Sequence, residues 1–158
     1  MSKTNDALKM LRQYKLETGK TEIDMHDVAR WAVDRGWPLP KPKSAFDLIA
    51  KEFSKAAAQE VRIGKHGRPY RANHAVTVPG NGTQLTFWID IDNTERRLIH
   101  RSLIQRREQM VGDAVQLSFD AEHWNTSHPK EEPIEIPLDF GPDVEWRRNA
   151  KNEDDKTG

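Results

Sequence analysis

Positively charged side chains between residues 51 and 71 are the part of this sequence best suited to chemistry. Six of the seven residues concerned are lysine or arginine and one is histidine, and Gly64 and Gly67 lie among them. Cations at fixed spacing neutralise phosphates and release their counterions, and glycine lets a loop approach another backbone closely. We therefore predict a nucleic-acid contact formed by Lys51, Lys55, Arg62, Lys65, His66, Arg68 and Arg71. The alternative is an ordinary solvated surface, since lysine and arginine are mostly exposed in any protein.

A helix and a hairpin are expected to position these cations. Ser44 and Asp47 have the Ser-x-x-Asp spacing of a helix start, and apolar residues at spacings of three and four then form one stripe on a helix of about 15 residues. Lys51 and Lys55 share a different face of that helix. A strand over residues 61–63, a glycine-containing turn and a strand from residue 70 follow, which predicts a basic hairpin.

Two further helices are expected before this one. The first covers about residues 4–16, capped by Thr4 or Asn5, and ends at Gly19. The second lies between a capping Asp24 and Gly36. Three prolines then predict a stiff, extended connector of about seven residues.

Alternation of side chains predicts an antiparallel sheet after the basic turn. Residues 70–78 alternate, with Tyr70, His74 and Val76 on one face. A Pro-Gly-Asn-Gly turn at residues 79–82 leads into a half-buried strand over residues 84–91. The sequence therefore predicts a three-stranded antiparallel sheet packed on three helices.

A long helix is expected from residue 92 to about residue 124. Asp92 and Glu95 are spaced as a helix start, and an apolar stripe continues as far as Trp124. Gly112 weakens the middle of this helix, which would span about 48 Å at 1.5 Å per residue if unbroken. Such a helix either breaks near Gly112 or lies along a partner.

The charges of this helix favour a second copy of the chain as the partner. The first half carries Arg96, Arg97, Arg101, Arg106 and Arg107, and the second half carries Glu108, Asp113, Asp120 and Glu122. Two antiparallel helices would match basic halves with acidic halves, so we predict a homodimer through residues 92–124. The alternative is a helix that folds back on its own domain.

The remainder, residues 125–158, is expected to be an extended acidic tail. Residues 134–140 alternate between apolar and polar side chains, so they could add an edge strand or dock as an extended peptide.

Composition limits the class of protein. The chain has 158 residues and no cysteine, which excludes disulfides, thiolate zinc sites and cysteine nucleophiles and fits a reducing cytoplasm. No apolar run approaches the ~20 residues of a membrane helix, so we expect a cytoplasmic protein without a membrane partner. The net charge is zero, but residues 1–75 carry 15 Lys/Arg and 9 Asp/Glu, whereas residues 76–158 carry 10 and 16. The net charges of +6 and −6 on these two parts allow one basic surface and one acidic surface.

Two other chemistries fit the residues less well. His123 and His128 are five residues apart, which is a poor spacing for two zinc ligands on one helix face. Asp90 and Asp92, with His100, could hold a divalent ion for hydrolysis, but alternation places both aspartates on the solvent side of their strand. We therefore expect no metal, no cofactor and no enzymatic activity.

The order of helices followed by a basic, wing-like hairpin resembles the winged helix-turn-helix superfamily over residues 4–91. Its connector is longer than the three or four residues of a plain helix-turn-helix, as winged variants tolerate. The stretches RPYRANHAV (residues 68–76) and QRREQ (residues 105–109) also resemble uncharacterised proteins of bacterial prophages and mobile elements.

Together these patterns predict an α+β protein with a winged-helix-like domain (residues 4–91), a long helix (92–124) and an extended acidic tail (125–158). The expected function is non-enzymatic DNA binding, with RNA as the alternative target, as a regulator or a DNA-engaging accessory subunit in a bacterial or phage system. The competing interpretation is a protein–protein adaptor that acts through the long helix and the C-terminal segment.

Overall fold

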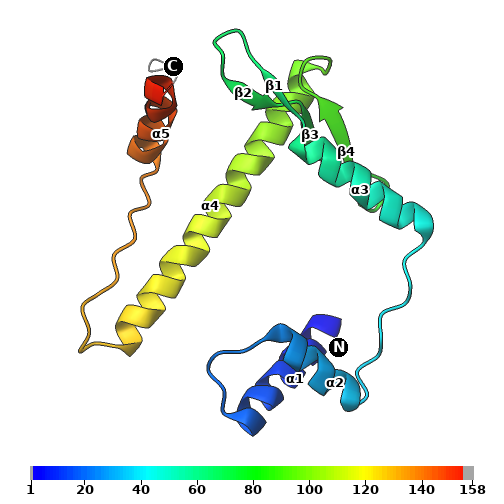
Figure 1. The fold of residues 1–158 in the computed structure, drawn as a ribbon, viewed down its shortest axis with the longest axis vertical. Helices are drawn as coiled ribbons and strands as arrows, with labels where there is room; N and C mark the ends of the chain where they lie inside the picture. Colours follow the sequence, from blue (N-terminus) through cyan, green and yellow to red (C-terminus); the bar gives the residue numbers. More distant parts are fainter. Residues whose placement is uncertain (1, 155–158) are drawn as a thin grey trace. The chain divides into compact units, whose positions relative to one another are not determined.

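The computed structural model describes residues 2–154 and has a mixed α+β architecture (Figure 1). The chain divides into two compact units, one up to Lys51 and one from Glu52 on. The described elements are α1 (Lys3–Thr18), α2 (Met25–Asp34), α3 (Ala45–Gln59), β1 (Val61–Ile63), β2 (Pro69–Arg71), β3 (Asn73–Pro79), β4 (Gln84–Asp90), α4 (Arg96–Ser127) and α5 (Gly141–Asp154).

The first unit contains α1 and α2, close to where the sequence predicts them. The cap of α1 is Ser2, whose side chain accepts a hydrogen bond from the backbone N–H of Asn5 at 3.3 Å; the predicted caps, Thr4 and Asn5, are wrong, and both lie inside the helix. Asp24 caps α2 as predicted. Tyr14 of α1 is buried, with its ring edge-on to Trp31 of α2 at 5.6 Å.

The start of α3 confirms the predicted cap, because the Ser44 hydroxyl accepts a hydrogen bond from the backbone N–H of Asp47 at 3.1 Å. The apolar stripe is present on this helix, but none of its side chains is buried. Phe46 and Phe53 are 84% and 72% exposed.

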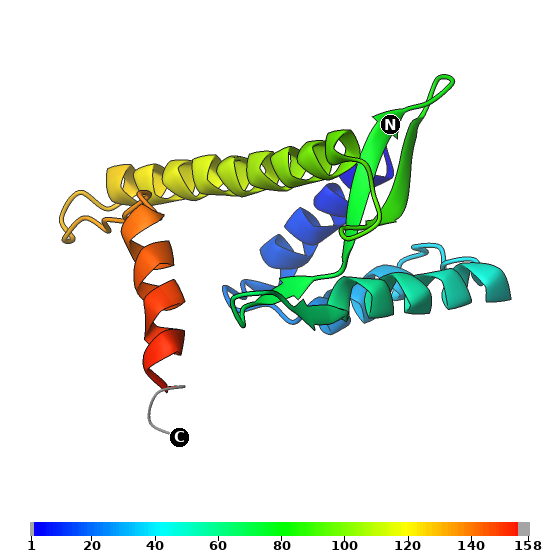
Figure 2. The ribbon, with the colours of Figure 1, turned by 90° about the horizontal axis from the view of Figure 1, so that it is seen from above.

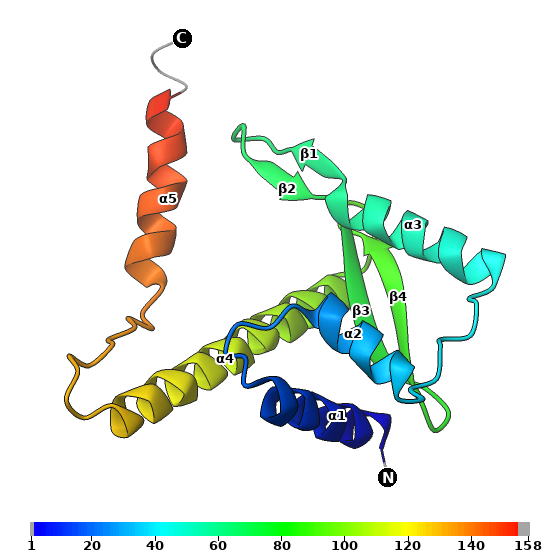
Figure 3. The same ribbon diagram turned by 60° about the horizontal axis from the view of Figure 1, so that its bottom comes forward.

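Two separate two-stranded antiparallel sheets replace the predicted three-stranded sheet (Figure 3). In one sheet β1 pairs with β2, and in the other β3 pairs with β4. The chain changes partner at the buried Ala72: its N–H donates to the Glu60 carbonyl at 3.0 Å, and its carbonyl accepts from Ile91 N–H at 2.9 Å. The side-chain alternation from Tyr70 to Val78 runs through this switch, so the sequence pattern does not reveal the break between the sheets.

The core of the second unit gathers around β3. Ala72, Val76 and Ile89 are buried, and so is His74, whose Nε2 lies 2.9 Å from the Arg71 carbonyl. These residues confirm the predicted inner face. Leu85 and Phe87, which share a face of β4 with the buried Ile89, are 55% and 37% exposed, so only the end of that strand is half-buried as predicted.

Helix α4 is one continuous helix of 32 residues and passes through Gly112 without a break (Figure 2). At 1.5 Å per residue it is about 48 Å long. The predicted start at Asp92 is wrong. Glu95 holds the cap position and makes no side-chain capping bond. The Asp92 carboxylate is bound by Arg62 and Tyr70 instead.

The chain after α4 is not extended throughout, contrary to the prediction for residues 125–158. Helix α5 occupies Gly141–Asp154, and residues 155–158 lie outside the described part. Residues 132–140 are neither helix nor strand, so the predicted edge strand is absent there. The Asn125 side chain holds Ile134 by both backbone groups, donating to its carbonyl at 2.9 Å and accepting from its N–H at 2.8 Å.

Candidate nucleic-acid interface

The turn of the β1–β2 hairpin presents three of the predicted cations. The turn is closed by backbone bonds from Gly64 N–H to the Arg68 carbonyl at 2.9 Å and from Gly67 N–H to the Gly64 carbonyl at 3.0 Å. Gly67 has φ 72°, a left-handed conformation that favours glycine. Lys65, His66 and Arg68 are exposed on this turn. Within the described part of the chain, no carboxylate forms an ion pair with any of the three.

Arg62, also predicted to contact nucleic acid, is instead held by carboxylates. Its guanidinium donates to both oxygens of Asp90 at 2.9 and 3.0 Å and to Asp92 at 2.7 Å. Glu60 lies 3.6 Å away from the same guanidinium. The phenol of Tyr70, directly opposite Arg62 in the hairpin, donates to Asp92 at 2.8 Å. Arg62 and Tyr70 therefore fasten the β1–β2 hairpin to the end of β4.

This cluster shifts the pKa of three groups. Hydrogen bonds to Asp90 and then Asp92 raise the pKa of Arg62, which stays charged. The bonds from Arg62 lower the pKa of Asp90 to about 2, helped by the backbone N–H of Asp92. Donation to the Asp92 carboxylate raises the pKa of Tyr70 above its ordinary value. The ion pair is thus complete at neutral pH.

The local charge balance follows from this pairing. Residues 61–71 contain no aspartate or glutamate, and the carboxylates that approach them from β4 bind Arg62 at the base of the hairpin. The turn keeps the charges of Lys65 and Arg68, and Arg71 is exposed at the end of β2. The hairpin therefore carries a neutralised base and a positively charged tip.

Arg71 also lines a cavity of about 360 Å³ between β3, β4 and α4. Arg106 of α4 and Trp88 of β4 line the same cavity. Trp88 is 40% exposed and pairs with Ala75 in the sheet. An arginine pair beside a partly exposed indole is chemically suited to phosphate and base contacts. Sequence analysis missed Arg106 here, because only the tertiary structure brings α4 beside the sheet.

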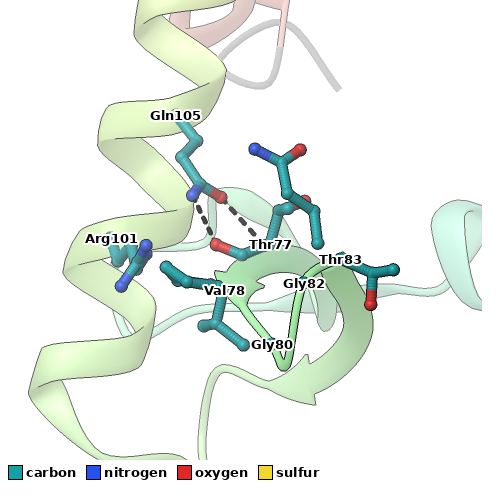
Figure 4. Close-up of a pocket in the computed structure, with 9 residues that line it drawn as sticks. Thr77, Val78, Gly80, Gly82, Thr83, Arg101 and Gln105 are labelled. Atoms are coloured by element: carbon teal, nitrogen blue, oxygen red, sulfur yellow. Dashed lines mark hydrogen bonds between the residues drawn. The ribbon is translucent and has the colours of Figure 1, made fainter.

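Polar side chains of α4 hold the free edge of β3. Gln105 accepts from the backbone N–H of Thr77 at 3.0 Å and donates to its carbonyl at 2.7 Å, and Ser102 donates to the Ala75 carbonyl at 2.5 Å. Figure 4 shows Gln105 reaching the Thr77 backbone inside a second cavity, of about 350 Å³, which Arg101 and the glycine turn after β3 also line. The Gln105 amide thus replaces the neighbouring strand that β3 lacks on this side.

Of the two predicted lysines on α3, only one belongs to the same unit as the hairpin. Both are exposed and lie four residues apart, one helical turn, on the same helix. Lys55 belongs to the second unit with the hairpin, whereas Lys51 is the last residue of the first unit. Only Lys55 can therefore be considered together with the hairpin cations.

The residues considered for a metal site or for hydrolysis make other contacts in the structure. Asp90 and Asp92, considered above as possible ligands of a divalent ion, bind Arg62. His128 caps the end of α4, where its ring stacks on Trp124 at 3.7 Å. Among the described residues, no group of three histidine, aspartate or glutamate side chains is arranged to hold a metal ion.

Comparisons of the chain with protein-family models, with curated proteins and with solved structures gave no match. In the described residues, no helix combines the length and apolar character that crossing a membrane requires.

Proposed function

We propose that this protein binds DNA without enzymatic activity, as a regulator or a DNA-engaging accessory subunit of a bacterial or phage system. The observation that carries the proposal is the charge of the β1–β2 hairpin. Lys65, Arg68 and Arg71 are exposed and form no ion pair with a carboxylate among the described residues, while the nearby carboxylates are engaged by Arg62. Exposed cations on a short, fastened hairpin can bind phosphates without first breaking internal ion pairs.

In this proposal the hairpin is the wing of a winged-helix-like domain. His66 is exposed on the turn of this hairpin. Lys55 adds a cation from α3. Arg62 has a supporting role, since its bonds to Asp90 and Asp92 hold the base of the wing. Phosphate contacts of this kind orient a protein on the duplex and carry no sequence information by themselves.

The salt dependence of binding to a random-sequence DNA duplex tests the proposal. Each phosphate contact contributes about 0.9 to the slope of log K against log salt. A Lys65/Arg68/Arg71→Ala variant removes three contacts, so its slope should be shallower by about 2.7. Between 50 and 200 mM salt, that difference corresponds to roughly 40-fold in relative affinity.

A variant with three other exposed cations replaced, Lys130/Arg147/Arg148→Ala, is the matched control. It has the same change in net charge and should keep the wild-type slope. Equal loss in both variants would show that net charge, rather than the hairpin, causes the binding. An RNA duplex measured in parallel identifies the target, because tighter binding to RNA would reassign the hairpin to RNA.

A second candidate function is a protein–protein adaptor. It is favoured by the large apolar side chains that α4 and the segment after it leave exposed. An adaptor of this kind should show no DNA binding at 50 mM salt, where phosphate contacts are strongest. The same titration therefore distinguishes the two functions.

A further inference from the structure

Helix α4 turns its polar side toward the sheet. The side chains that meet β3 are those of Ser102 and Gln105, which bond to the strand's backbone. Ser102 is only 4% exposed. These hydrogen bonds make part of the contact with the sheet, and several large apolar side chains of the helix remain exposed.

Large apolar side chains of α4 are exposed on two stripes. Leu103, Met110, Leu117 and Trp124, at seven-residue spacing, form one stripe and are 42% to 54% exposed. Ile104, Val111, Val115 and Phe119 are 40% to 58% exposed and lie about 100° or more around the helix from the first stripe. A stable protein–protein interface buries about 800 Å² per partner, and the first stripe supplies roughly half of that area.

The surface continues beyond the helix. Six more apolar side chains between residues 134 and 146 are 40% to 71% exposed: Ile134, Ile136, Leu138, Phe140, Val144 and Trp146. The two backbone bonds from Asn125 fasten the start of this segment to α4. A partner seated on α4 thus has additional apolar surface available at the end of the helix.

The charges of α4 indicate what kind of partner fits. Residues 96–111 contain five arginines and one glutamate, whereas residues 112–127 contain three acidic residues and no lysine or arginine. A parallel copy would place like charges side by side, which is unfavourable. An antiparallel copy places each basic half beside an acidic half.

We propose that α4 forms an antiparallel homodimer seam with a second copy of this chain. Leu103, Met110, Leu117 and Trp124 recur every seven residues, the repeat of a helix–helix seam. Ala114 and Ala121 follow four residues after Met110 and Leu117, on the same side of the helix. Full overlap of the two helices pairs residues whose numbers add to about 224. In this register Leu103 faces Ala121 and Met110 faces Ala114, whereas Leu117 faces Arg107 and Trp124 faces His100.

The same register has an electrostatic consequence. It brings Arg106 of one copy close to Asp120 of the other, at both ends of the seam. Arg106 forms no ion pair within the described part of its own chain. The hairpin cations take no part in the seam, and Arg106 is the one residue that it shares with the cavity lined by Arg71 and Trp88.

Sedimentation equilibrium of the full chain at several concentrations tests the seam. The expected result is a dimer that dissociates on dilution. Met110→Glu places a charge at the centre of the apolar stripe and should weaken dimerisation at least about tenfold. His123→Glu, an exposed position on the other side of α4, is the matched control and should leave dimerisation unchanged.

Circular dichroism of both variants shows that the helix remains formed. A wild-type chain that is monomeric at every concentration would overturn the proposal and leave the apolar face to a different protein. A dimer that Met110→Glu does not weaken would also overturn it.

Single cysteines test the direction of the pairing, because the chain has none of its own. Position 113 lies next to the two-fold axis, so Asp113→Cys should crosslink to its equivalent with a short thiol-reactive reagent. Leu103→Cys should not crosslink, since the two copies of position 103 are about 27 Å apart in an antiparallel pair. Efficient crosslinking of Leu103→Cys would show a parallel pair and refute the register.

Discussion

Gln105→Glu is the most informative perturbation of the fold, because the Gln105 amide both accepts from and donates to the Thr77 backbone. At neutral pH the introduced carboxylate can still accept from the N–H, but it cannot donate to the carbonyl. The half-buried carbonyl is left without its hydrogen bond, at a cost of about 1–3 kcal/mol. We therefore expect the free energy of unfolding to fall by about 1–3 kcal/mol at pH 7.

The loss should depend on pH. A protonated carboxyl can donate to the carbonyl, so folding raises the pKa of the introduced group above its unfolded value of about 4.3. The stabilising bond is then present below pH ~4.3 and is lost as the pH rises through the folded pKa. Urea unfolding at a series of pH values measures this difference from the wild type.

Gln109→Glu is the control. Gln109 lies one turn further along α4 and, like Gln105, lines the cavity between β3, β4 and α4. It forms no hydrogen bond within the described residues. If both variants lose the same stability at every pH, the Gln105–Thr77 bonds do not hold the edge of β3.

Three further predictions follow from the cluster around Arg62 and from α4. Arg62 lowers the pKa of Asp90 to about 2, so Asp90 stabilises the fold at pH values above its unfolded pKa of about 3.9, and this stabilisation is lost as the pH falls toward 2. Asp90→Asn should remove this acid dependence from the hydrogen-exchange protection of β1. Protection that depends on pH as in the wild type would contradict the Arg62–Asp90 pairing. Asp92→Asn should lower the raised pKa of Tyr70 in an absorbance titration, unless the phenol does not donate to Asp92. Gly112→Ala should raise the free energy of unfolding by about 0.5–1 kcal/mol in urea, because an added Cβ meets nothing within 4 Å; a loss of stability would mean that this side of α4 is covered.

Local features were predictable from the sequence because neighbouring residues decide them. Asp24 caps α2, and the Ser44 hydroxyl caps α3. The proline-rich connector after Gly36 is non-helical, as the steric restriction before each proline requires. Alternation also placed His74 and Val76 on the buried face of β3.

Helix ends were less predictable where a side chain had a better partner elsewhere. Asp92 has the spacing of a helix cap, yet it bonds to Arg62 and Tyr70 and leaves the start of α4 to Glu95. The only available sequence signal was the same-side spacing of Asp90 and Asp92, which indicates a shared partner without saying which cation supplies it. The partner, Arg62, is 28 residues from Asp90 along the chain.

The sequence by itself determined the α+β class, most of the elements and the cluster of cations around the hairpin, because propensity, capping and periodicity act over a few residues. The tertiary structure decided which cations remain available. It paired Arg62 with two aspartates and left Lys65, Arg68 and Arg71 exposed. It also divided one alternating stretch between two sheets at Ala72 and turned the polar side of α4 toward β3. Each of these outcomes depends on contacts between residues far apart in the chain, and no local pattern encodes them.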